Sequence, residues 1–418
     1  MNTKYTVPRG TSDILPKDAY KWEYMESLFR KVAKSFGYQE ICTPIFEQTE
    51  VFERSAGDTT DIVQKEMYRF QDKKGRTFAL RPEGTAPVIR SYIENNLGSD
   101  GQITKLFYIG NMFRYDRPQA GRSRQFSQYG CECIGTVHPY YDAENIAVFW
   151  TYLKTLGLKN FVVEINSIGC PNCSETYNTV LKEYFQKSLE ILCPDCQSRY
   201  EKNPKRLLDC KVPQCKEIAM KSPSMLDFLD ERCQIHFGEV QRYLKILKVN
   251  YIVNSRIVRG LDYYTQTAFE FINNNLGSQN ALGGGGRYDG LVQQMGGKDT
   301  PAVGFAGGFS RLLLSLEQEN LYQGEFARPK YYIISFNEET TSKAIEILDF
   351  LRNKGIYAEF EIEKTSMKSQ MKSADRLKAE YTIILGEDEL SQNMLSLKNM
   401  TTGEQKQIAL DKIEELCL

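Results

Sequence analysis

The sequence predicts an α+β protein in three parts: a main domain on a largely antiparallel sheet, a helical insertion within it, and a small α/β domain after it. Strand-like segments separated by few helices fill the chain up to the insertion. The stretch 170–245 is rich in charge and cysteine and has a helical pattern, and strands alternate with helices from Pro329 onward. We therefore expect domains at 1–328, with 170–245 inserted, and at 329–418.

The main domain is expected to open with an amphipathic helix at 18–36, because apolar residues recur there at spacings of three and four. A strand from Tyr38 to Ile45, which ends near Pro44, should follow it. The other elements expected before the insertion are one helix and three strands: Gly84–Asn96, Glu66–Phe70, Thr77–Leu80 and Leu106–Phe113.

Core-like sequence resumes after the insertion at Tyr251, with Ile252, Val253, Ile257 and Val258. Two glycine-rich segments, Gly283–Gly286 and Gly304–Gly308, are expected to be turns that close the main domain. In the last part of the chain we expect strands and helices in alternation: Tyr331–Phe336, a helix ending at Gly355, Tyr357–Ile362, 366–380 and Tyr381–Gly386.

Composition excludes several classes of function. The net charge is −1, so a nucleic-acid partner must meet a local basic patch. Only two histidines occur, His138 and His236, which argues against a histidine base or a histidine metal cluster. No apolar run approaches the ~20 residues of a membrane span, and no signal peptide is visible. We therefore expect a cytoplasmic protein with no membrane partner, whose eleven cysteines are reduced thiols or metal ligands.

The segment Leu80–Thr85 places Glu83 and Thr85 at an expected junction between a strand and a helix. A carboxylate and a hydroxyl at that position can hold an ammonium group. The alternative is a helix-capping turn, since a glutamate near a helix N-terminus is stabilising by itself.

The segment 113–126 carries four arginines and one aspartate between two expected strands, a net charge of +3. Guanidinium groups chelate phosphate oxygens, and the ring of Phe126 offers an aromatic face. The segment therefore favours a nucleotide site, with a solvated basic loop as the alternative. Beyond it, Gln128 and Glu132 share one face of a strand, opposite Tyr129 and Cys131.

Two further segments combine arginine, tyrosine and glycine. Within 258–265, the rings of Tyr263 and Tyr264 can enclose a flat ligand beside Arg259, although aromatic core packing is the alternative. The glycines of 281–289 and 304–311 allow the backbone to approach a ligand or another strand closely, but plain turns have the same composition.

Together these segments resemble the class II aminoacyl-tRNA synthetases and, within them, the histidyl-tRNA synthetase family. The general likeness rests on the helix and strand that end at Pro44, the hairpin at Arg114, and the strand and helix that carry Arg311. The specific likeness rests on two segments, Arg259–Thr265 and Gly283–Asp289, and the resemblance covers essentially the whole chain. Two positions depart from the family pattern: Ser310 stands in place of an acidic residue, and Gln266 in place of a basic one.

The resemblance implies an ATP-dependent aminoacyl-tRNA ligase. L-histidine and ATP, which carries Mg²⁺, give histidyl-adenylate and pyrophosphate, and the histidyl group then passes to the 3′ end of tRNA(His). The segment 329–418 is similar to the family's anticodon-binding domain. The helix 18–36 with the strand after it corresponds to a homodimer interface, although the apolar stripe of that helix can equally serve an intramolecular core.

The resemblance also assigns residues. Arg114 and Arg259 are the expected catalytic groups: Arg114 on the α-phosphate, and Arg259 beside the α-phosphate and the substrate carboxylate. The residues expected to bind ATP are Arg114, Arg122, Phe126 and Arg311, with Arg311 over the adenine opposite Phe126. Neutral imidazole offers one donor and one acceptor, and the residues expected to bind histidine are Glu83, Gly84, Thr85, Gln128, Glu132, Arg259, Tyr263 and Tyr264.

Two other functions share the fold. A catalytically inactive, synthetase-like regulatory subunit of histidine biosynthesis generally lacks the anticodon-binding domain, and a pure RNA-binding module has no need of ATP contacts. The expected domain at 329–418 and the arginines at 114, 259 and 311 disfavour both.

Cysteines in the insertion could hold a metal. Cys193 and Cys196 form a Cys-x₂-Cys pair, as do Cys170 and Cys173, and two further cysteines follow. Such pairs can complete a tetrahedral Cys₄ zinc site. The expected ligands of a structural Zn²⁺ are Cys193, Cys196, Cys210 and Cys215, with free, partly buried thiols as the alternative.

Overall fold

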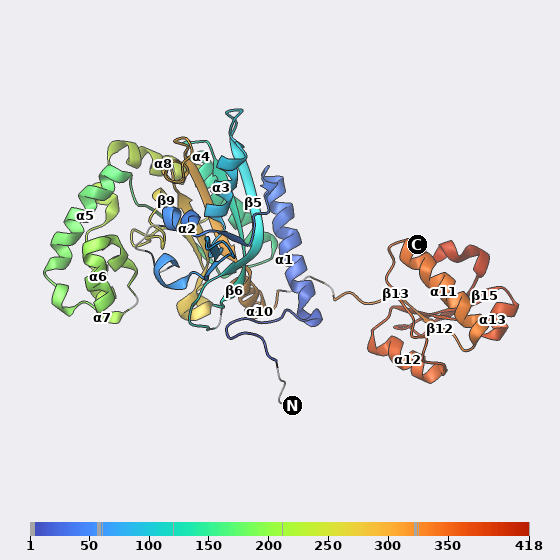
Figure 1. Cartoon of the computed structure of the whole chain (residues 1–418). Helices are drawn as coiled ribbons and strands as arrows, with labels where there is room; N and C mark the ends of the chain where they lie inside the picture. Colours follow the sequence, from blue (N-terminus) through green and yellow to red (C-terminus); the bar gives the residue numbers. More distant parts are fainter. Residues whose placement is uncertain are drawn as a thin grey trace. The chain divides into compact units, whose positions relative to one another are not determined.

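A computed structural model describes the following residues: 5–56, 60, 62–119, 121–210, 212–321, 324 and 326–417. The chain forms two compact units, Met1–Gly324 and Glu325–Leu418 (Figure 1). Within the described part of the chain, no helix has both the length and the apolar character that a membrane crossing needs.

A sheet of eight strands forms the centre of the first unit. Its neighbours pair antiparallel except at the two edges, where β1 pairs with β5, and β7 with β8, in parallel. The predicted largely antiparallel sheet is therefore confirmed. In order across the sheet the strands are β1 (Gln39–Glu40), β5 (Thr104–Phe113), β6 (Gln125–Ile134), β11 (Ala302–Gly308), β10 (Ala281–Arg287), β9 (Thr265–Ile272), β7 (Val162–Ser167) and β8 (Ile252–Val253).

The glycine-rich segments are strands, and the prediction of turns is wrong. Gly283–Gly286 lies in β10 and Gly304–Gly308 in β11, which pair antiparallel with Gly285 opposite Phe305. A Cβ added to Gly285 would overlap the carbonyl oxygen of Gly304 on the neighbouring strand. These glycines therefore serve close contact between strands rather than chain reversal.

Helices cover both faces of the sheet. On one face, α1 (Pro16–Ser35), α4 (Tyr140–Thr155) and α10 (Phe309–Gln318) share a core with Phe107 and Tyr129. On the other, Leu106 and Tyr108 of β5 pack against Val88 of α3 (Thr85–Glu94). The apolar stripe of α1 is buried in the first core. It therefore serves intramolecular packing, which the sequence analysis gave as the alternative to a homodimer interface.

Two helices of the first unit, α2 (Thr49–Ala56) and α9 (Leu291–Gln294), lie beside α3. A three-stranded sheet of β2 (Phe46–Gln48), β4 (Thr77–Leu80) and β3 (Arg69–Gln71) lies beside α2.

Three strand predictions for the first unit need correction, and in the second unit the expected strand Tyr357–Ile362 is only two residues long, Ala358–Glu359. The expected strand Tyr38–Ile45 is only two residues long, and a π-helix, Ile62–Glu66, precedes β3 where a strand was expected to begin. Ile252 and Val253 are 50% and 44% exposed rather than core residues, because β8 is an edge strand next to β7, whereas Ile257 is buried as predicted.

The insertion is helical and has a core of its own (Figure 1, green to yellow-green). Its α-helices are α5 (Pro171–Gln186), α6 (Pro194–Lys202), α7 (Pro213–Met220) and α8 (Glu231–Ile246). Short 3₁₀ helices at Leu189–Ile191, Pro204–Asp209 and Met225–Phe228 connect them.

The second unit is a five-stranded α/β domain. The strand order is β13 (Ala358–Glu359), β12 (Tyr331–Ile334), β14 (Tyr381–Ile384), β15 (Met394–Asn399) and β16 (Gln405–Ala409). The first three strands are parallel and the last two pair antiparallel, as the partly parallel prediction requires. Its α-helices are α11 (Glu338–Asn353), α12 (Met367–Arg376) and α13 (Glu387–Ser391).

Candidate functional site

A cavity of about 340 Å³ opens on the face of the sheet where β6, β10 and β11 lie together. The turn before α3, the β5–β6 hairpin, the loop after β8 and the start of α10 complete its wall. Ten of the residues predicted to act on substrate line it: Glu83, Thr85, Arg114, Arg122, Phe126, Gln128, Arg259, Tyr263, Tyr264 and Arg311. Segments far apart in the sequence therefore meet at one place.

One wall of the cavity is cationic. The Arg114 side chain donates from Nε to the carbonyl of Pro82 (2.8 Å), and its guanidinium lies 5.3 Å from the ring centroid of Phe126. Arg311 donates from Nη1 to the carbonyl of Ala281 (2.9 Å). Burial lowers the pKa of both guanidinium groups, although each remains protonated near neutral pH. The wall therefore presents partly desolvated positive charge, which suits phosphate oxygens.

Arg122 belongs to the same wall but is held by acidic neighbours. Its Nε is ion-paired with Asp116, and its Nη2 lies 3.8 Å from a carboxylate oxygen of Glu66. Asp116 itself lines the cavity. Arg122 therefore has to exchange a carboxylate for a phosphate if it is to bind a nucleotide.

Arg259 lies in the loop between β8 and β9. Its Nη1 donates to Glu270 Oε1 at 2.5 Å, and its guanidinium lies 5.3 Å from the ring centroid of Tyr264. Its buried Nε has no hydrogen-bond partner among the residues that the structure describes. A buried donor of this kind is costly unless a ligand completes it, so this side chain is suited to an anionic substrate.

Glu270 was missed by the sequence analysis. It lines the cavity from β9 and pairs with Arg259. Glu270 lies in β9, beyond the segment 258–265, and the sequence predicted no strand there.

Glu83 fits both readings of its motif. Its two carboxylate oxygens accept the backbone N–H groups of Thr85 (2.7 Å) and Ala86 (2.8 Å), which caps α3. The same carboxyl lines the cavity, and burial raises its pKa. The capping bonds therefore fix the orientation of a carboxyl group that faces the cavity.

Gly84 lies behind the cavity wall rather than on it. Its N–H donates to Oε1 of Gln128 at 3.1 Å, and a Cβ at this position would overlap the ring of Tyr108. The absence of a side chain thus lets the turn before α3 lie against β5 and orients the amide of Gln128.

Glu132 is fully buried and likewise lies behind the wall. Its carboxyl accepts the hydroxyl proton of Thr85 (2.7 Å) and that of Tyr288. Burial raises the pKa of Glu132 to about 8 despite these two hydrogen bonds. Tyr288 was not assigned from the sequence, although it stands in the segment Gly283–Asp289 on which the resemblance rests.

The glycines of β10 and β11 make room for these side chains. A Cβ at Gly284 would lie 2.8 Å from Nη1 of Arg259, and one at Gly286 would lie 3.0 Å from the ring of Tyr264. A Cβ at Gly304 would overlap the carboxylate of Glu132. The glycine-rich strands therefore form a wall of backbone against which the polar side chains are positioned.

A buried ion pair supports this wall from behind. Arg287 and Asp142 are both fully buried and bond to each other, and Arg287 also donates to the carbonyl of Thr136 (2.8 Å). Burial alone would raise the pKa of Asp142, but Arg287 and His236 hold it well below its usual range. Arg287 therefore links β10 to α4 and takes no part in the cavity.

The two departures from the family pattern lie at or near the site. Ser310 lines the cavity beside Arg311. Gln266 is buried with a φ of 49°, and its Nε2 lies 3.4 Å from a carboxylate oxygen of Asp289. Neither departure falls on a residue that the resemblance assigns to the chemistry.

The four predicted zinc ligands lie together in the insertion. The sulfur atoms of Cys193, Cys196, Cys210 and Cys215 are all within 4.8 Å of one another. A second group, which the sequence analysis did not assemble, consists of Cys170, Cys173, Asp230 and Cys233.

Two family models match the sequence. The model described as "Histidyl-tRNA synthetase" matches residues 10–172 and 211–312, and the model described as "Anticodon binding domain" matches residues 330–418. The segment between the two matched stretches of the first model lies in the helical insertion.

Proteins of known sequence or structure resemble the chain over nearly its whole length. A histidine–tRNA ligase of Clostridioides difficile is 48% identical over 410 residues, with 98% of each chain covered. The solved apo histidyl-tRNA synthetase of S. aureus is 38% identical, with 99% of each chain covered and a TM-score of 0.84. An ATP phosphoribosyltransferase regulatory subunit/histidyl-tRNA synthetase of Bacillus halodurans shares the fold alone, with 22% identity, a TM-score of 0.66, and 89% and 97% of the two chains covered.

Proposed function

The chain belongs to the histidyl-tRNA synthetase family, and from this premise we propose that it ligates L-histidine to tRNA(His) at the expense of ATP. One observation carries the proposal: a single cavity joins a cationic wall to a pocket of carboxyl, hydroxyl and amide groups. The first suits the phosphates of a nucleotide, and the second suits the ammonium group and imidazole of an amino acid.

The first step forms histidyl-adenylate. The histidine carboxylate attacks the α-phosphorus of ATP, the bond from that phosphorus to the bridging oxygen breaks, and pyrophosphate leaves. Arg114 and Arg259 offset the negative charge that develops on the phosphoryl oxygens, while Phe126 and Arg311 enclose the adenine. Such a reaction depends on positioning and fixed charge rather than on a side-chain nucleophile.

Bound with ATP, Mg²⁺ would supply further charge neutralisation on the phosphates. The carboxylate of Glu270 would hold this ion, because it lines the cavity beside Arg259 and offers the oxygen ligands that Mg²⁺ prefers.

Histidine is selected by groups that match both ends of the molecule. Glu83 and Thr85 hold its ammonium group, and Gln128 and Tyr263 complete the pocket. The hydroxyl of Tyr264 lies on the cavity wall and reads an imidazole nitrogen, while Glu132, behind the wall, accepts the hydroxyl proton of Thr85 and so orients that side chain. An apolar isostere would leave these polar groups unpaired, which gives strong discrimination.

The second step transfers the histidyl group from the adenylate to the ribose at the 3′ end of tRNA(His). The unit Glu325–Leu418 contains the residues that match the anticodon-binding family model, 330–418, and it binds the anticodon region of the tRNA. The chain works in the cytoplasm as a homodimer. An exposed aromatic face on the three-stranded sheet supports the dimer: Phe46 and Phe70 are 51% and 42% exposed, with ring centroids 5.9 Å apart.

ATP–pyrophosphate exchange tests this proposal directly. Purified protein should incorporate labelled pyrophosphate into ATP only when histidine is present, and it should charge tRNA(His). Histidine binding without exchange would instead indicate a regulatory subunit of histidine biosynthesis. tRNA binding without either reaction would indicate an RNA-binding module.

A further inference from the structure

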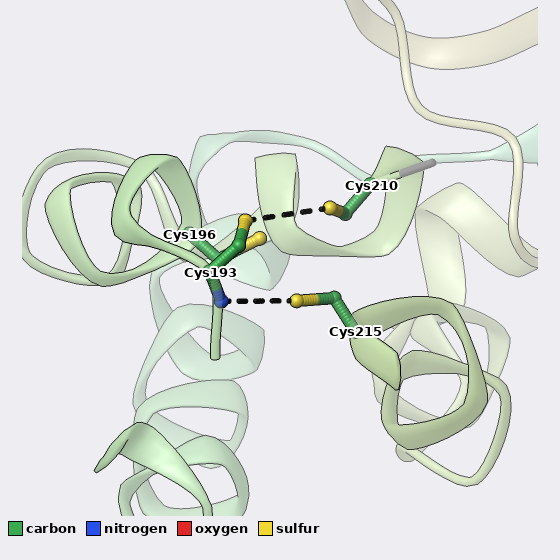
Figure 2. A group of neighbouring side chains, drawn as sticks. All are labelled: Cys193, Cys196, Cys210 and Cys215. Carbon is green, nitrogen blue, oxygen red and sulfur yellow. Dashed lines mark hydrogen bonds between the residues drawn. The ribbon is translucent and has the colours of Figure 1, made fainter. Parts of the chain in front are cut away.

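Four cysteines in the insertion converge from three helices. Cys193 directly precedes α6 and Cys196 lies in its first turn, Cys210 follows the 3₁₀ helix Pro204–Asp209, and Cys215 lies in the first turn of α7. Figure 2 shows their side chains pointing toward one another. Three of them are buried and Cys193 is partly buried, so the sulfur atoms meet inside the insertion rather than on its surface.

The spacing of the sulfur atoms is compatible with a metal tetrahedron. Cys193 Sγ lies 3.8 Å from Cys210 Sγ, and all four sulfur atoms lie within 4.8 Å of one another. A Zn–S bond of about 2.3 Å gives a tetrahedral S···S edge of about 3.8 Å, whereas a disulfide needs about 2.05 Å. The N–H of Cys193 also donates to Cys215 Sγ at 3.2 Å, as backbone amides do to metal-bound thiolates. We propose that these cysteines bind a structural Zn²⁺.

A second centre is supported by separate residues at the root of the insertion. Cys170 and Cys173 begin α5, while Asp230 and Cys233 begin α8. Cys173 Sγ lies 3.5 Å from Cys170 Sγ and 3.9 Å from Cys233 Sγ, and Asp230 Oδ2 lies 3.1 Å from Cys170 Sγ. Three thiolates and one carboxylate oxygen are an acceptable zinc ligand set. We propose that this cluster binds a second Zn²⁺, which joins the first and last helices of the insertion.

Asp230 has two separate roles in this arrangement. Its Oδ1 accepts the N–H of Cys233 at 2.7 Å and caps α8, which leaves Oδ2 directed at the cysteines. The sequence analysis missed this residue because an aspartate before a helix is fully explained by capping, and because it lies far from the first Cys-x₂-Cys pair.

The first proposed zinc site is connected to the substrate cavity through a short segment of the insertion. Its ligands are Cys193, Cys196, Cys210 and Cys215. Between its second and third ligands lies a segment that contacts the loop of Arg259. Asn203 Nδ2 donates to Asp262 Oδ1 at 2.9 Å, and Arg206 Nη2 donates to the carbonyl of Gly260 at 2.5 Å. A metal that ties both ends of this segment therefore holds in place the loop that carries Arg259, Tyr263 and Tyr264. This step rests on the proposed role of that loop in binding histidine.

Zinc content tests both sites in the full-length protein, purified without chelator. We expect about two equivalents of zinc per chain, and about one in Cys210→Ser and in Cys233→Ser. Cys42→Ser is the matched control, since Cys42 is exposed and outside both clusters, and it should keep both zinc ions. Less than about a tenth of an equivalent in the parent protein would overturn both sites. An unchanged zinc content in one cysteine variant would overturn that site alone.

Cobalt provides a readout that is independent of activity and of folding yield. Protein whose zinc has been exchanged for Co²⁺ should show the thiolate charge-transfer and ligand-field absorption of tetrahedral Co²⁺ sites. The absorption should fall by about half in Cys210→Ser, which lacks one of the two sites. Absorption of octahedral cobalt, or a Cys193–Cys210 disulfide found by peptide mapping, would overturn the Cys₄ site.

The link to the cavity is tested with Arg206→Ala, which removes a contact but no metal ligand. We expect both zinc ions to remain, KM for histidine to rise about tenfold through loss of a charged hydrogen bond, and KM for ATP to change less. Lys202→Ala, at an exposed position in α6, is the matched control and should leave KM for histidine unchanged. An unaltered KM in Arg206→Ala would overturn the link, whereas failure of the proposed function would appear as absent histidine-dependent exchange in the parent protein.

Discussion

Arg259 is held by Glu270 through one nitrogen, while its buried Nε has no hydrogen-bond partner among the described residues. We predict that Arg259→Ala lowers histidine-dependent pyrophosphate exchange by about 10²–10³-fold, the usual effect of removing one charge-stabilising donor. Thermal unfolding should change little. Arg242→Ala, an exposed arginine on α8, serves as the control for a lost positive charge. Near-normal exchange in Arg259→Ala would remove this residue from the mechanism.

Glu132 makes stability depend on pH. The unfolded chain releases this proton near pH 4.3, whereas burial raises the pKa of Glu132 to about 8 in the folded chain. Between these values the folded state alone keeps the proton, so the carboxyl lowers the free energy of unfolding as the pH rises through this window. Glu132→Gln cannot titrate, and its stability relative to the parent should increase from about pH 5 to about pH 8.

Urea unfolding at the two ends of that window measures the effect. Glu23→Gln, an exposed position on α1, should show the same difference from the parent at both pH values. A Glu132→Gln difference that is equally flat would mean that the folded carboxyl titrates normally.

The sequence predicted ten of the residues that line the cavity, because short motifs carry most of its chemistry. What it missed are partners across the sheet. Glu270 and Tyr288 become relevant only when β9 and β10 bring them to Arg259 and Glu132, and no local pattern shows which strands pair. Burial is equally hidden from local sequence, so Glu132 was expected on the wall and lies behind it.

At the scale of elements, the glycines of β10 and β11 could favour either a turn or close packing between strands, and local sequence does not distinguish the two. A glycine run is compatible with a turn and with a tightly packed strand, and only the neighbouring strand decides between them. Helix α1 was predicted to within two residues, since its apolar stripe is a local signal. The edge strand β8 was misread as core because its apolar residues have no covering layer.

The difference between packing and turn formation can be measured. A Cβ at Gly285 would overlap the carbonyl oxygen of Gly304, whereas one at Gly308 would meet nothing within 4 Å. We predict that Gly285→Ala lowers the free energy of unfolding by about 1–3 kcal/mol, as overpacking does, and that Gly308→Ala changes it far less. Equal stability of the two variants in urea would refute the packing explanation.

At the scale of the whole molecule, the two units should be separable in function. Deletion of residues 329–418 should spare histidine-dependent pyrophosphate exchange but strongly reduce charging of tRNA(His), because the first unit contains the cavity. Circular dichroism of the truncated chain checks that it is folded. Charging as efficient as that of the full chain would show that the second unit does not contribute to tRNA binding.

The oligomeric state of the whole molecule can also be tested. We predict that light scattering gives the mass of a dimer at micromolar concentration, and that Phe46→Ser shifts the chain toward monomer by removing exposed aromatic surface. Ile362→Ser, in the second unit and 61% exposed, is the control for loss of an exposed apolar side chain. A fully active monomer in the parent protein would contradict the proposal.

The backbone wall of β10 and β11 has a consequence for inhibitors. Gly283 and Gly284 line the cavity, and neither can gain a side chain, because a Cβ would overlap the carbonyl oxygen of Ala306 or of Phe269 on the neighbouring strand. A compound that lies against this wall would contact main-chain atoms that no substitution can remove. A substitution at these positions that weakened inhibitor binding would also damage the site. Few single substitutions in this wall should therefore give a resistant and active enzyme.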